Sequence, residues 1–293
     1  MFMQKKQDKI KVKSITIILL FFVFFSLLTN ISISRESAVP EKAYFKPLER
    51  MVLTKFFFTF KNLSPKTSTL YAKMIEKKFP APADNWFTQF CYSNICFLDE
   101  GESPKKFRSG EKETVDVSMQ PFAGAKIGEK GYVLLEIWPT VDPGLKERVE
   151  FYGILVDKKE IELIIGNNNA NINGKTEKLD VAPFIDKKSG RTLVPLRFIG
   201  EKLTAKIEWD SKESRVDYIL GDMTLSFWIN KKEANIKIGP NYTKKIALDI
   251  APIIVNSRTF VPVRVVSELL GAKVGWDGKT QKITILFPYP EEE

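Results

Sequence analysis

The sequence predicts a mainly β protein with an α+β C-terminal part. The first observation is a series of short extended runs between residues 51 and 157, separated by polar breaks that contain Gly or Pro. The second is a segment that occurs twice: residues 191–219 match residues 258–286 at a constant offset of 67, without a gap. In each copy, strand-like runs outnumber one short helical run. Together these predict a β-sandwich followed by a duplicated unit of antiparallel sheet plus helix.

The N-terminus predicts export. Five lysines lie within residues 5–13, and only Thr16 and Ser26 interrupt the apolar run over residues 15–28. A run of this length suits the core of a signal peptide better than a membrane span, which needs ~20 residues. If the apolar run is extended through Ile33, it approaches the length of a membrane span, so an uncleaved anchor with residues 10–33 in the membrane is the alternative. We therefore assign residues 1–34 to a signal peptide or membrane anchor, and the polar, proline-containing residues 35–50 to a linker.

Residues 51–157 are expected to form the sandwich. Several runs alternate apolar and polar residues, as residues 114–119 do, and short strands at this spacing indicate the immunoglobulin-like class. The stretch also resembles bacterial surface Ig-like domains. The seven expected strands are residues 51–60, 67–75, 85–92, 95–98, 114–120, 132–138 and 148–156.

Cys91 and Cys96 are the only cysteines, and their C-x4-C spacing differs from the C-x-x-C of redox centres and zinc knuckles. In an exported chain, an even pair favours one structural disulfide. The loop is short, so its stabilisation is modest, roughly 2 kcal/mol. Two free buried thiols, or a redox or metal role, are the alternatives.

The C-terminal residues 158–293 contain the two copies, expected as repeats 161–220 and 221–288. In each copy a proline takes the first helical position, where its missing N–H is tolerated. Apolar residues at i, i+3 and i+7 then mark a short helix, and an alternating pair of runs around a polar turn marks a β-hairpin. The helical stripes are Leu196, Ile199 and Leu203 in the first copy and Val263, Val266 and Leu270 in the second.

The shared frame is Asp-x-Ala-Pro, then Arg-Thr-x-Val-Pro-x-Arg, then Glu-x-Leu-x-Ala-Lys and Trp-Asp. It resembles the copper amine oxidase N-terminal-like domain, also called a stalk domain, over about residues 161–288. That family occurs, often as tandem units, in secreted and cell-surface proteins of Gram-positive bacteria. The resemblance implies tandem copies of an extracellular accessory module, which is not the catalytic part of a copper amine oxidase.

The chain contains no histidine. Imidazole is the usual copper ligand and the commonest general base, so its absence argues against a copper oxidase site, a Ser-His-Asp or Cys-His constellation and most catalytic zinc sites. We therefore expect no catalytic residue, no metal site and no cofactor.

Four residues are candidates for ligand binding: Trp209, Trp276, Arg197 and Arg264. Indole rings beside carboxylates suit carbohydrate sites, and the arginines suit an anionic polymer. The sequence favours a simpler interpretation, in which each Trp covers the core between sheet and helix, and each Arg pairs with a glutamate of its own helix.

The aspartates of the matched segments also have two interpretations. Asp180 and Asp249 suit acid–base chemistry in a hydrolase, but loop capping is the favoured role. Asp210 and Asp277 each follow a Trp and are expected to open the hairpin turn.

The net charge of +9 falls to +5 once residues 1–34, with five lysines and one aspartate, are set aside. The other lysines are scattered among glutamates, as on a solvated surface, so no nucleic-acid partner is expected. The sequence thus predicts a non-catalytic extracellular or cell-surface protein for spacing, wall attachment or protein–protein contact, with a cell-wall polymer or another surface protein as partner. A carbohydrate-binding module and a hydrolase with a carboxylate pair are the alternatives.

Overall fold

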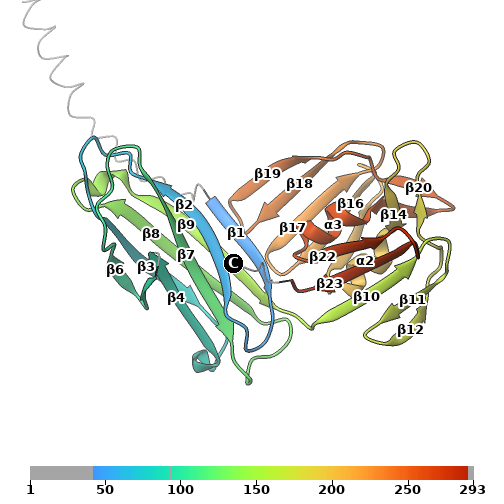
Figure 1. The fold of residues 1–293 in the computed structure, drawn as a ribbon, viewed down its shortest axis with the longest axis horizontal. Coiled ribbons are helices and arrows are strands. Elements are labelled where there is room, and N and C mark those ends of the chain that lie inside the picture. Colours follow the sequence, from blue (N-terminus) through green and yellow to red (C-terminus); the bar gives the residue numbers. More distant parts are fainter. Residues whose placement is uncertain (1–41, 93, 290–293) are drawn as a thin grey trace, which may run out of the picture. The chain divides into compact units, whose positions relative to one another are not determined.

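The computed structural model describes residues 42–92 and 94–289 (Figure 1). All of them belong to one compact unit, residues 39–293. The expected signal peptide or anchor, residues 1–34, lies outside the described residues. Within the described part of the chain, no helix has the length and apolar character needed to cross a membrane.

The first part of the described chain is the expected sandwich of two sheets, with strand orders β1-β9-β8-β3-β6 and β2-β7-β4-β5. Two 3-10 turns, Ala83–Asn85 and Pro143–Leu145, lie between strands. The strands are β1 (Lys42–Leu48), β2 (Thr54–Lys61), β3 (Leu70–Lys78), β4 (Trp86–Tyr92), β5 (Ile95–Phe97), β6 (Glu100–Glu102), β7 (Lys112–Pro121), β8 (Lys130–Pro139) and β9 (Glu147–Leu155).

Aromatic side chains from both sheets meet in the sandwich core. In β2, the alternation of the sequence buries Phe56, Phe58 and Phe60 and leaves Phe57 exposed. Phe151 of β9, in the opposite sheet, lies 5.8 Å from Phe56 and 5.7 Å from Phe58 between ring centroids. The period-two pattern of the sequence therefore decides which rings fill the space between the sheets.

Residues 42–48 correct the expected linker. They form β1, which pairs in parallel with β9 from Lys42↔Val149 to Leu48↔Leu155. Pro47 made this segment look unlike a strand, but β1 lies at the edge of its sheet, where a missing N–H is tolerated.

A disulfide joins Cys91 and Cys96, as the sequence predicted. The two residues face each other across the β4–β5 pairing. The bond therefore links two residues that are already paired in the β4–β5 hairpin. The alternatives of free thiols and a metal role are wrong.

The second part of the described chain contains three sheets and two short helices. Each helix begins directly after the expected proline and buries the expected stripe. The elements of the first half are β10 (Lys159–Ile164), β11 (Asn169–Ile172), β12 (Lys175–Lys178), β13 (Phe184–Ile185), β14 (Thr192–Pro195), α2 (Leu196–Lys202), β15 (Lys206–Asp210) and β16 (Arg215–Leu220). Those of the second half are β17 (Met223–Trp228), β18 (Glu233–Ile238), β19 (Tyr242–Ala247), β20 (Ile253–Val255), β21 (Arg258–Pro262), α3 (Val263–Leu269), β22 (Lys273–Asp277) and β23 (Lys282–Phe287).

The two halves exchange their hairpins. Strands β15 and β16 of the first half extend the second half's sheet, in the order β15-β16-β17-β18-β19, and β22 and β23 extend the first half's sheet, in the order β12-β11-β10-β23-β22. A third sheet, β13-β14-β21-β20, takes two strands from each half. Every sheet of this region therefore contains strands of both halves.

The register of the third sheet shows an approximate two-fold relation between the halves. Strand β14 pairs antiparallel with β21, and Val194 lies opposite Val261, its own counterpart at the offset of 67. Two matched positions that face each other in an antiparallel pair lie on either side of a two-fold axis.

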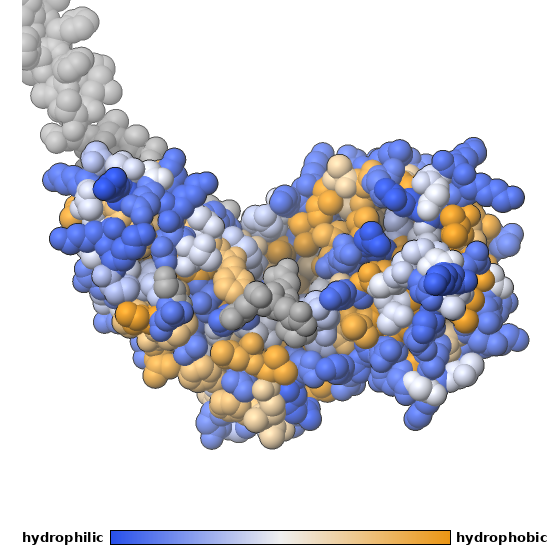
Figure 2. All heavy atoms as spheres, viewed as in Figure 1, coloured by the Kyte–Doolittle hydropathy of each residue, from blue (hydrophilic) through white to orange (hydrophobic). Residues whose placement is uncertain are grey.

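The buried core of this region is one cluster that takes residues from all three sheets and both helices. It also includes Ala43, Tyr152 and Ile154 of β1 and β9. On the face shown in Figure 2, apolar surface remains in separate patches among charged side chains.

Candidate functional site

Two surface grooves lie in the C-terminal region, and each is named here by its tryptophan. The Trp209 groove has a volume of about 710 Å³ and the Trp276 groove about 370 Å³. The Trp209 groove is defined by Glu177, Lys178, Asp180, Pro195, Arg197, Glu201, Lys202, Ile207, Trp209, Val216, Ile254 and Arg258. The Trp276 groove is defined by Ile185, Arg191, Asp249, Pro262, Arg264, Val274, Trp276 and Ile283.

The two grooves are built from matched positions. Each has a proline and an arginine at the start of its helix, an aliphatic residue and a tryptophan on an edge strand, and a further aliphatic residue on the neighbouring strand. At the offset of 67, the corresponding pairs are Pro195 and Pro262, Arg197 and Arg264, Ile207 and Val274, Trp209 and Trp276, and Val216 and Ile283.

Each groove also contains an arginine from the other half. Arg258 of β21 lines the Trp209 groove, and Arg191, which precedes β14, lines the Trp276 groove. This follows from the pairing of β14 with β21, which carries the start of each strand towards the helix of the other half. Neither groove is complete within one half of the sequence.

The four sequence-predicted candidates come together in two pairs. Arg197 and Trp209 line one groove, and Arg264 and Trp276 line the other. The sequence expected the matched residues to serve packing, whereas the structure gathers them around solvent-accessible hollows.

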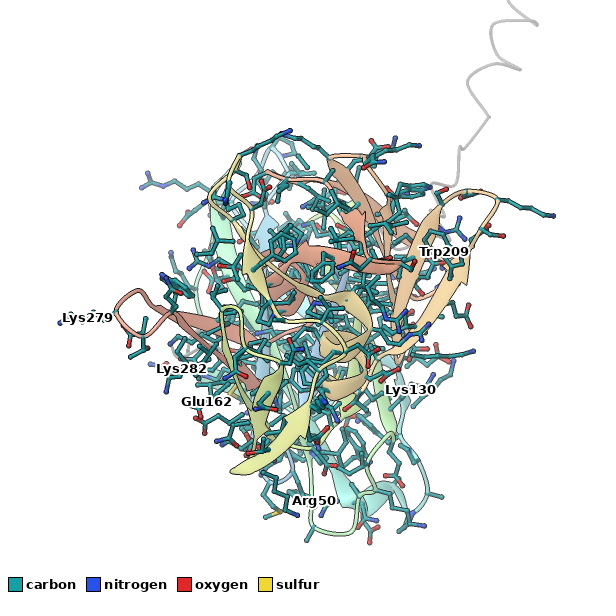
Figure 3. All side chains as sticks on the ribbon, turned by 90° about the vertical axis from the view of Figure 1, so that its right-hand side faces the viewer. Arg50, Lys130, Glu162, Trp209, Lys279 and Lys282 are labelled. Atoms are coloured by element: carbon teal, nitrogen blue, oxygen red, sulfur yellow. A yellow bond between two sulfur atoms is a disulfide. The ribbon has the colours of Figure 1, made fainter. Side chains whose placement is uncertain are left out.

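The two tryptophans are only about half buried. Trp209 is 48% exposed and Trp276 is 43% exposed, and neither ring has a stacking, cation–π or hydrogen-bond partner among the described residues. Figure 3 labels Trp209 on its edge strand. The other three tryptophans all have ring contacts, with centroid distances of 5.4 Å from Trp86 to Phe79 and 5.1 Å from Trp138 to Tyr71, and the Lys231 ammonium 5.7 Å from Trp228.

Helix position explains the exposure of Trp209. Helix α2 packs over Ile207, because a Cβ on Gly200 would lie only 2.3 Å from the Cδ1 of Ile207. Trp209 lies two residues further along β15, on the same face but beyond this contact, opposite Val216 of β16. The ring is therefore only partly covered, which is less than a full packing role would require.

The helix arginines are also less engaged than expected. Arg197 has no hydrogen bond or ion pair with any described residue, so the expected pair with Glu201 does not form. In the second half, Arg264 Nε lies 3.8 Å from Glu268 Oε1, and both side chains are more than half exposed. An exposed pair at this distance contributes little, so both guanidinium groups remain available to a ligand.

Asp180 and Asp249 form ion pairs between the halves. Arg258 donates from Nη2 to Asp180 Oδ2 at 3.1 Å, and Arg191 donates from Nε to Asp249 Oδ2. The two carboxylates thus position the cross-half arginines instead of capping loops. Because they line different grooves, they do not form the facing acid pair that a glycosidase needs.

Asp210 and Asp277 open their turns, as expected. Asp210 Oδ1 accepts from the backbone N–H of Lys212 at 2.9 Å, and Asp277 Oδ1 accepts from that of Lys279 at 2.9 Å. A further hydrogen bond from the Thr280 hydroxyl is the largest cause that lowers the pKa of Asp277 below its ordinary value. The hydrogen bonds of these two carboxylates therefore stabilise the hairpin turns.

The two grooves combine the same types of side chain. Within residues 42–92 and 94–289, no group of three or more potential metal ligands is assembled. Each groove instead offers an open indole face, an aliphatic floor and a guanidinium group. The sequence missed the aliphatic floor and the cross-half arginines. The signal for the arginines was present in the repeated Arg-Thr pair, but their destination depends on the exchange of strands.

Comparison with known proteins adds one family match. Residues 171–285 match the model of the copper amine oxidase N-terminal domain once, in a single stretch that runs from β11 to β23. The sequence had predicted tandem copies of this domain, and the match instead takes parts of both halves as one copy. No protein with a curated description matches the chain.

The chain also has distant matches among solved structures. The N-terminal domain of PorA is 14% identical, with 40% of this chain and 88% of that chain covered and a TM-score of 0.29. The periplasmic chaperone SfaE is 9% identical, with 70% and 95% covered and a TM-score of 0.28. A family 123 glycoside hydrolase from Clostridium perfringens is 7% identical, with 40% and 23% covered and a TM-score of 0.29. Similarities this low carry no argument about function.

Proposed function

We propose that this chain is a non-catalytic, exported module that attaches to the cell wall through its C-terminal region, with the sandwich as a spacer. The observation that carries the proposal is the pair of matched grooves, in which exposed Trp and Arg side chains are presented without a reaction centre among the described residues. The family match supports it, because the N-terminal domain of a copper amine oxidase is not its catalytic part.

Export is part of the same proposal. The basic and apolar N-terminal segment, residues 1–34, and the disulfide between Cys91 and Cys96 both suit an oxidising compartment outside the cytosol. A wall polymer or another surface protein is the proposed partner.

We further infer that residues 159–287 arose by duplication of one strand–helix–hairpin unit. The matched sequence segments, the same order of elements in both halves and the Val194↔Val261 register support this. On this view the domain is the exchanged pair, and one half alone is not a copy of it.

Co-sedimentation with isolated Gram-positive cell walls tests the attachment. The full-length chain is mixed with native walls and with walls stripped of protein by protease. Pelleting with both preparations supports a polymer partner, and pelleting with native walls alone supports a surface protein. Failure to pellet with either contradicts wall attachment. Mass spectrometry of the protein from its native cell tests export: an intact, cytosolic chain without the disulfide would contradict it.

A carbohydrate-binding role is the second candidate, and the exposure of both groove tryptophans favours it. The hydrolase has less support, because Glu177, Asp180 and Asp249 are each paired with a cation and leave Glu201 as a single acid of the grooves outside such a pair among the described residues.

A further inference from the structure

The unpartnered indoles are the first sign of a ligand. A single exposed ring on a surface is ordinary, but the same exposure at two matched positions, each in a groove, is a pattern that a ligand would use. Among the five tryptophans, the two that lack any ring or hydrogen-bond partner in the described part of the chain occupy the same place in the two grooves. Their exposure at matched positions is therefore a property of the groove and not an accident of one strand.

The groove floor specifies the shape of the ligand. Trp209 lies opposite Val216 across the β15–β16 pair, and Trp276 lies opposite Ile283 across the β22–β23 pair. Ring and aliphatic side chain thus lie on one face of the sheet, where Val216 and Ile283 are buried and the half-exposed indole is the apolar platform that faces solvent. The C–H face of a sugar ring fits such a platform, while its hydroxyl groups remain free to hydrogen-bond at the rim.

The charges of the grooves specify a further property of the ligand. The Trp209 groove has four cationic side chains against three acidic ones, and the Trp276 groove has two against one. Most of these charges pair internally, through Arg258–Asp180, Lys202–Glu177 and Arg191–Asp249. Outside these pairs, the Trp276 groove retains Arg264, and the Trp209 groove retains Arg197 and Lys178 against Glu201. Each groove therefore keeps a net positive charge that includes a helix arginine, whose planar guanidinium matches a carboxylate.

We propose that the two grooves are equivalent binding sites for a glycan chain that carries carboxylate groups. One sugar face packs on Trp209 or Trp276, and a carboxylate of the chain pairs with Arg197 or Arg264. This inference rests on the proposed function and names the class of polymer. Because the grooves are separate, one chain of this protein holds two segments of glycan, and a long polymer that reaches both is bound more tightly than a short one.

The test compares tetrasaccharides that differ only in their carboxylates. The full-length protein is titrated, by calorimetry and tryptophan fluorescence, with a β-1,4-linked glucuronic acid tetramer, with cellotetraose as its neutral counterpart, and with tetraglutamate as an acidic peptide. We expect two glucuronic acid tetramers per chain, cellotetraose weaker by about tenfold or more, and no binding of tetraglutamate. Equal binding of tetraglutamate, or no binding of either sugar, overturns the proposal.

Variants assign the sites. Trp209→Ala and Trp276→Ala each remove one of the two sites, and the double variant removes both. Trp209→Phe keeps an aromatic ring and is expected to retain partial binding. It serves as the second variant if Trp209→Ala fails to fold. Trp228→Ala is the matched control, because Trp228 lies on β17 in the same region but lines neither groove. Unchanged binding in the folded double variant places the ligand elsewhere and overturns the proposal.

The arginines are tested through selectivity. Arg197→Gln and Arg264→Gln together are expected to bring the affinity for the glucuronic acid tetramer down to that for cellotetraose, with cellotetraose binding itself unchanged. Retained preference for the charged sugar contradicts the assigned pairing. The two proposals fail separately. If the protein pellets with cell walls but binds neither tetramer, wall attachment stands and the glycan proposal is overturned. If it binds the glucuronic acid tetramer but does not pellet with walls, only wall attachment is overturned.

Discussion

The sandwich and the C-terminal region use their aromatic residues in opposite ways. In the sandwich, Trp86 is 6% exposed and stacks on Phe79, and three of the four Phe rings of β2 are buried in the core. In the C-terminal region, Trp209 and Trp276 stand open on edge strands. The comparison teaches that ring content alone does not locate function in this chain: the aromatic-rich region is scaffold, and the region with few open rings presents the grooves.

The largest expected change in stability distinguishes a buried ring of the sandwich from an exposed ring of the C-terminal region. Phe151→Ala removes a ring that is 0% exposed between the two sheets, and we expect it to lower the free energy of unfolding by about 3–5 kcal/mol. Trp209→Ala removes a larger ring from the surface and should change it by less than about 0.5 kcal/mol. Urea unfolding followed by circular dichroism measures both. A comparable loss in the two variants would show that Trp209 does pack on the core.

The next largest change in stability is expected at one matched position of the two halves. Gly200 of α2 corresponds to Ser267 of α3. A Cβ on Gly200 would lie 2.3 Å from the ring of Tyr218, which is buried and hydrogen-bonded to Leu196 O, so Gly200→Ala should destabilise by about 1–3 kcal/mol.

Ser267→Ala should have the opposite sign. Ser267 is fully buried, and its Oγ has no hydrogen-bond partner in the described structure, so removing the hydroxyl should be neutral or stabilise by up to about 1 kcal/mol. Thermal unfolding of both variants checks the pair, and destabilisation by Ser267→Ala would reveal a partner for this hydroxyl.

A smaller, pH-dependent effect belongs to the sandwich alone. Burial opposes ionisation of Glu136, but hydrogen bonds from Lys146 and Arg148, each at 2.8 Å, overcome it and lower the pKa of Glu136 below its ordinary 4.5. We expect Glu136→Gln to destabilise by about 1–2 kcal/mol at neutral pH, since both partners are partly exposed.

The sign of its pH dependence follows from the lowered pKa. The stabilisation is fully present above pH 4.5 and is lost as the pH falls through the lower folded-state pKa. Unfolding measured between pH 7 and pH 3 should therefore show the difference between wild type and Glu136→Gln constant above about pH 5.5 and shrinking below 4.5. A difference that grows on acidification would contradict this account.

The smallest effect compares the two ion pairs between the halves. Double-mutant cycles with Arg191→Ala and Asp249→Ala, and with Arg258→Ala and Asp180→Ala, should each give a coupling of roughly 0–1 kcal/mol, because all four side chains are substantially exposed. Added salt should reduce both. Couplings that differ strongly would break the equivalence of the two grooves.

Local patterns predicted the local elements of this fold. A proline followed by an apolar stripe was sufficient for α2 and α3, and period-two alternation was sufficient for most strands. Pro47 concealed β1, because an edge strand tolerates a proline that a central strand excludes. The exchange of hairpins was not predictable from either pattern, since the apolar face of β16 or β23 suits both sheets equally well.

The candidate site was also predicted only in part, because local patterns identify residues but not their tertiary surroundings. The sequence identified Trp209, Trp276, Arg197 and Arg264, but it favoured buried rings and arginines paired within their own helices. Exposure of Trp209 depends on where α2 ends its contact with β15, and the presence of Arg258 beside it depends on the β14–β21 pairing. Both are tertiary facts that local residue types do not contain.

The pairing of Val194 with Val261 bears on the history of the molecule. A polypeptide of only half this region would leave its sheets short of strands and would have to borrow them from a second copy of itself. Under the duplication proposed above, this arrangement corresponds to a symmetric homodimer joined into one chain, and a half expressed alone would be expected to self-associate or fail to fold.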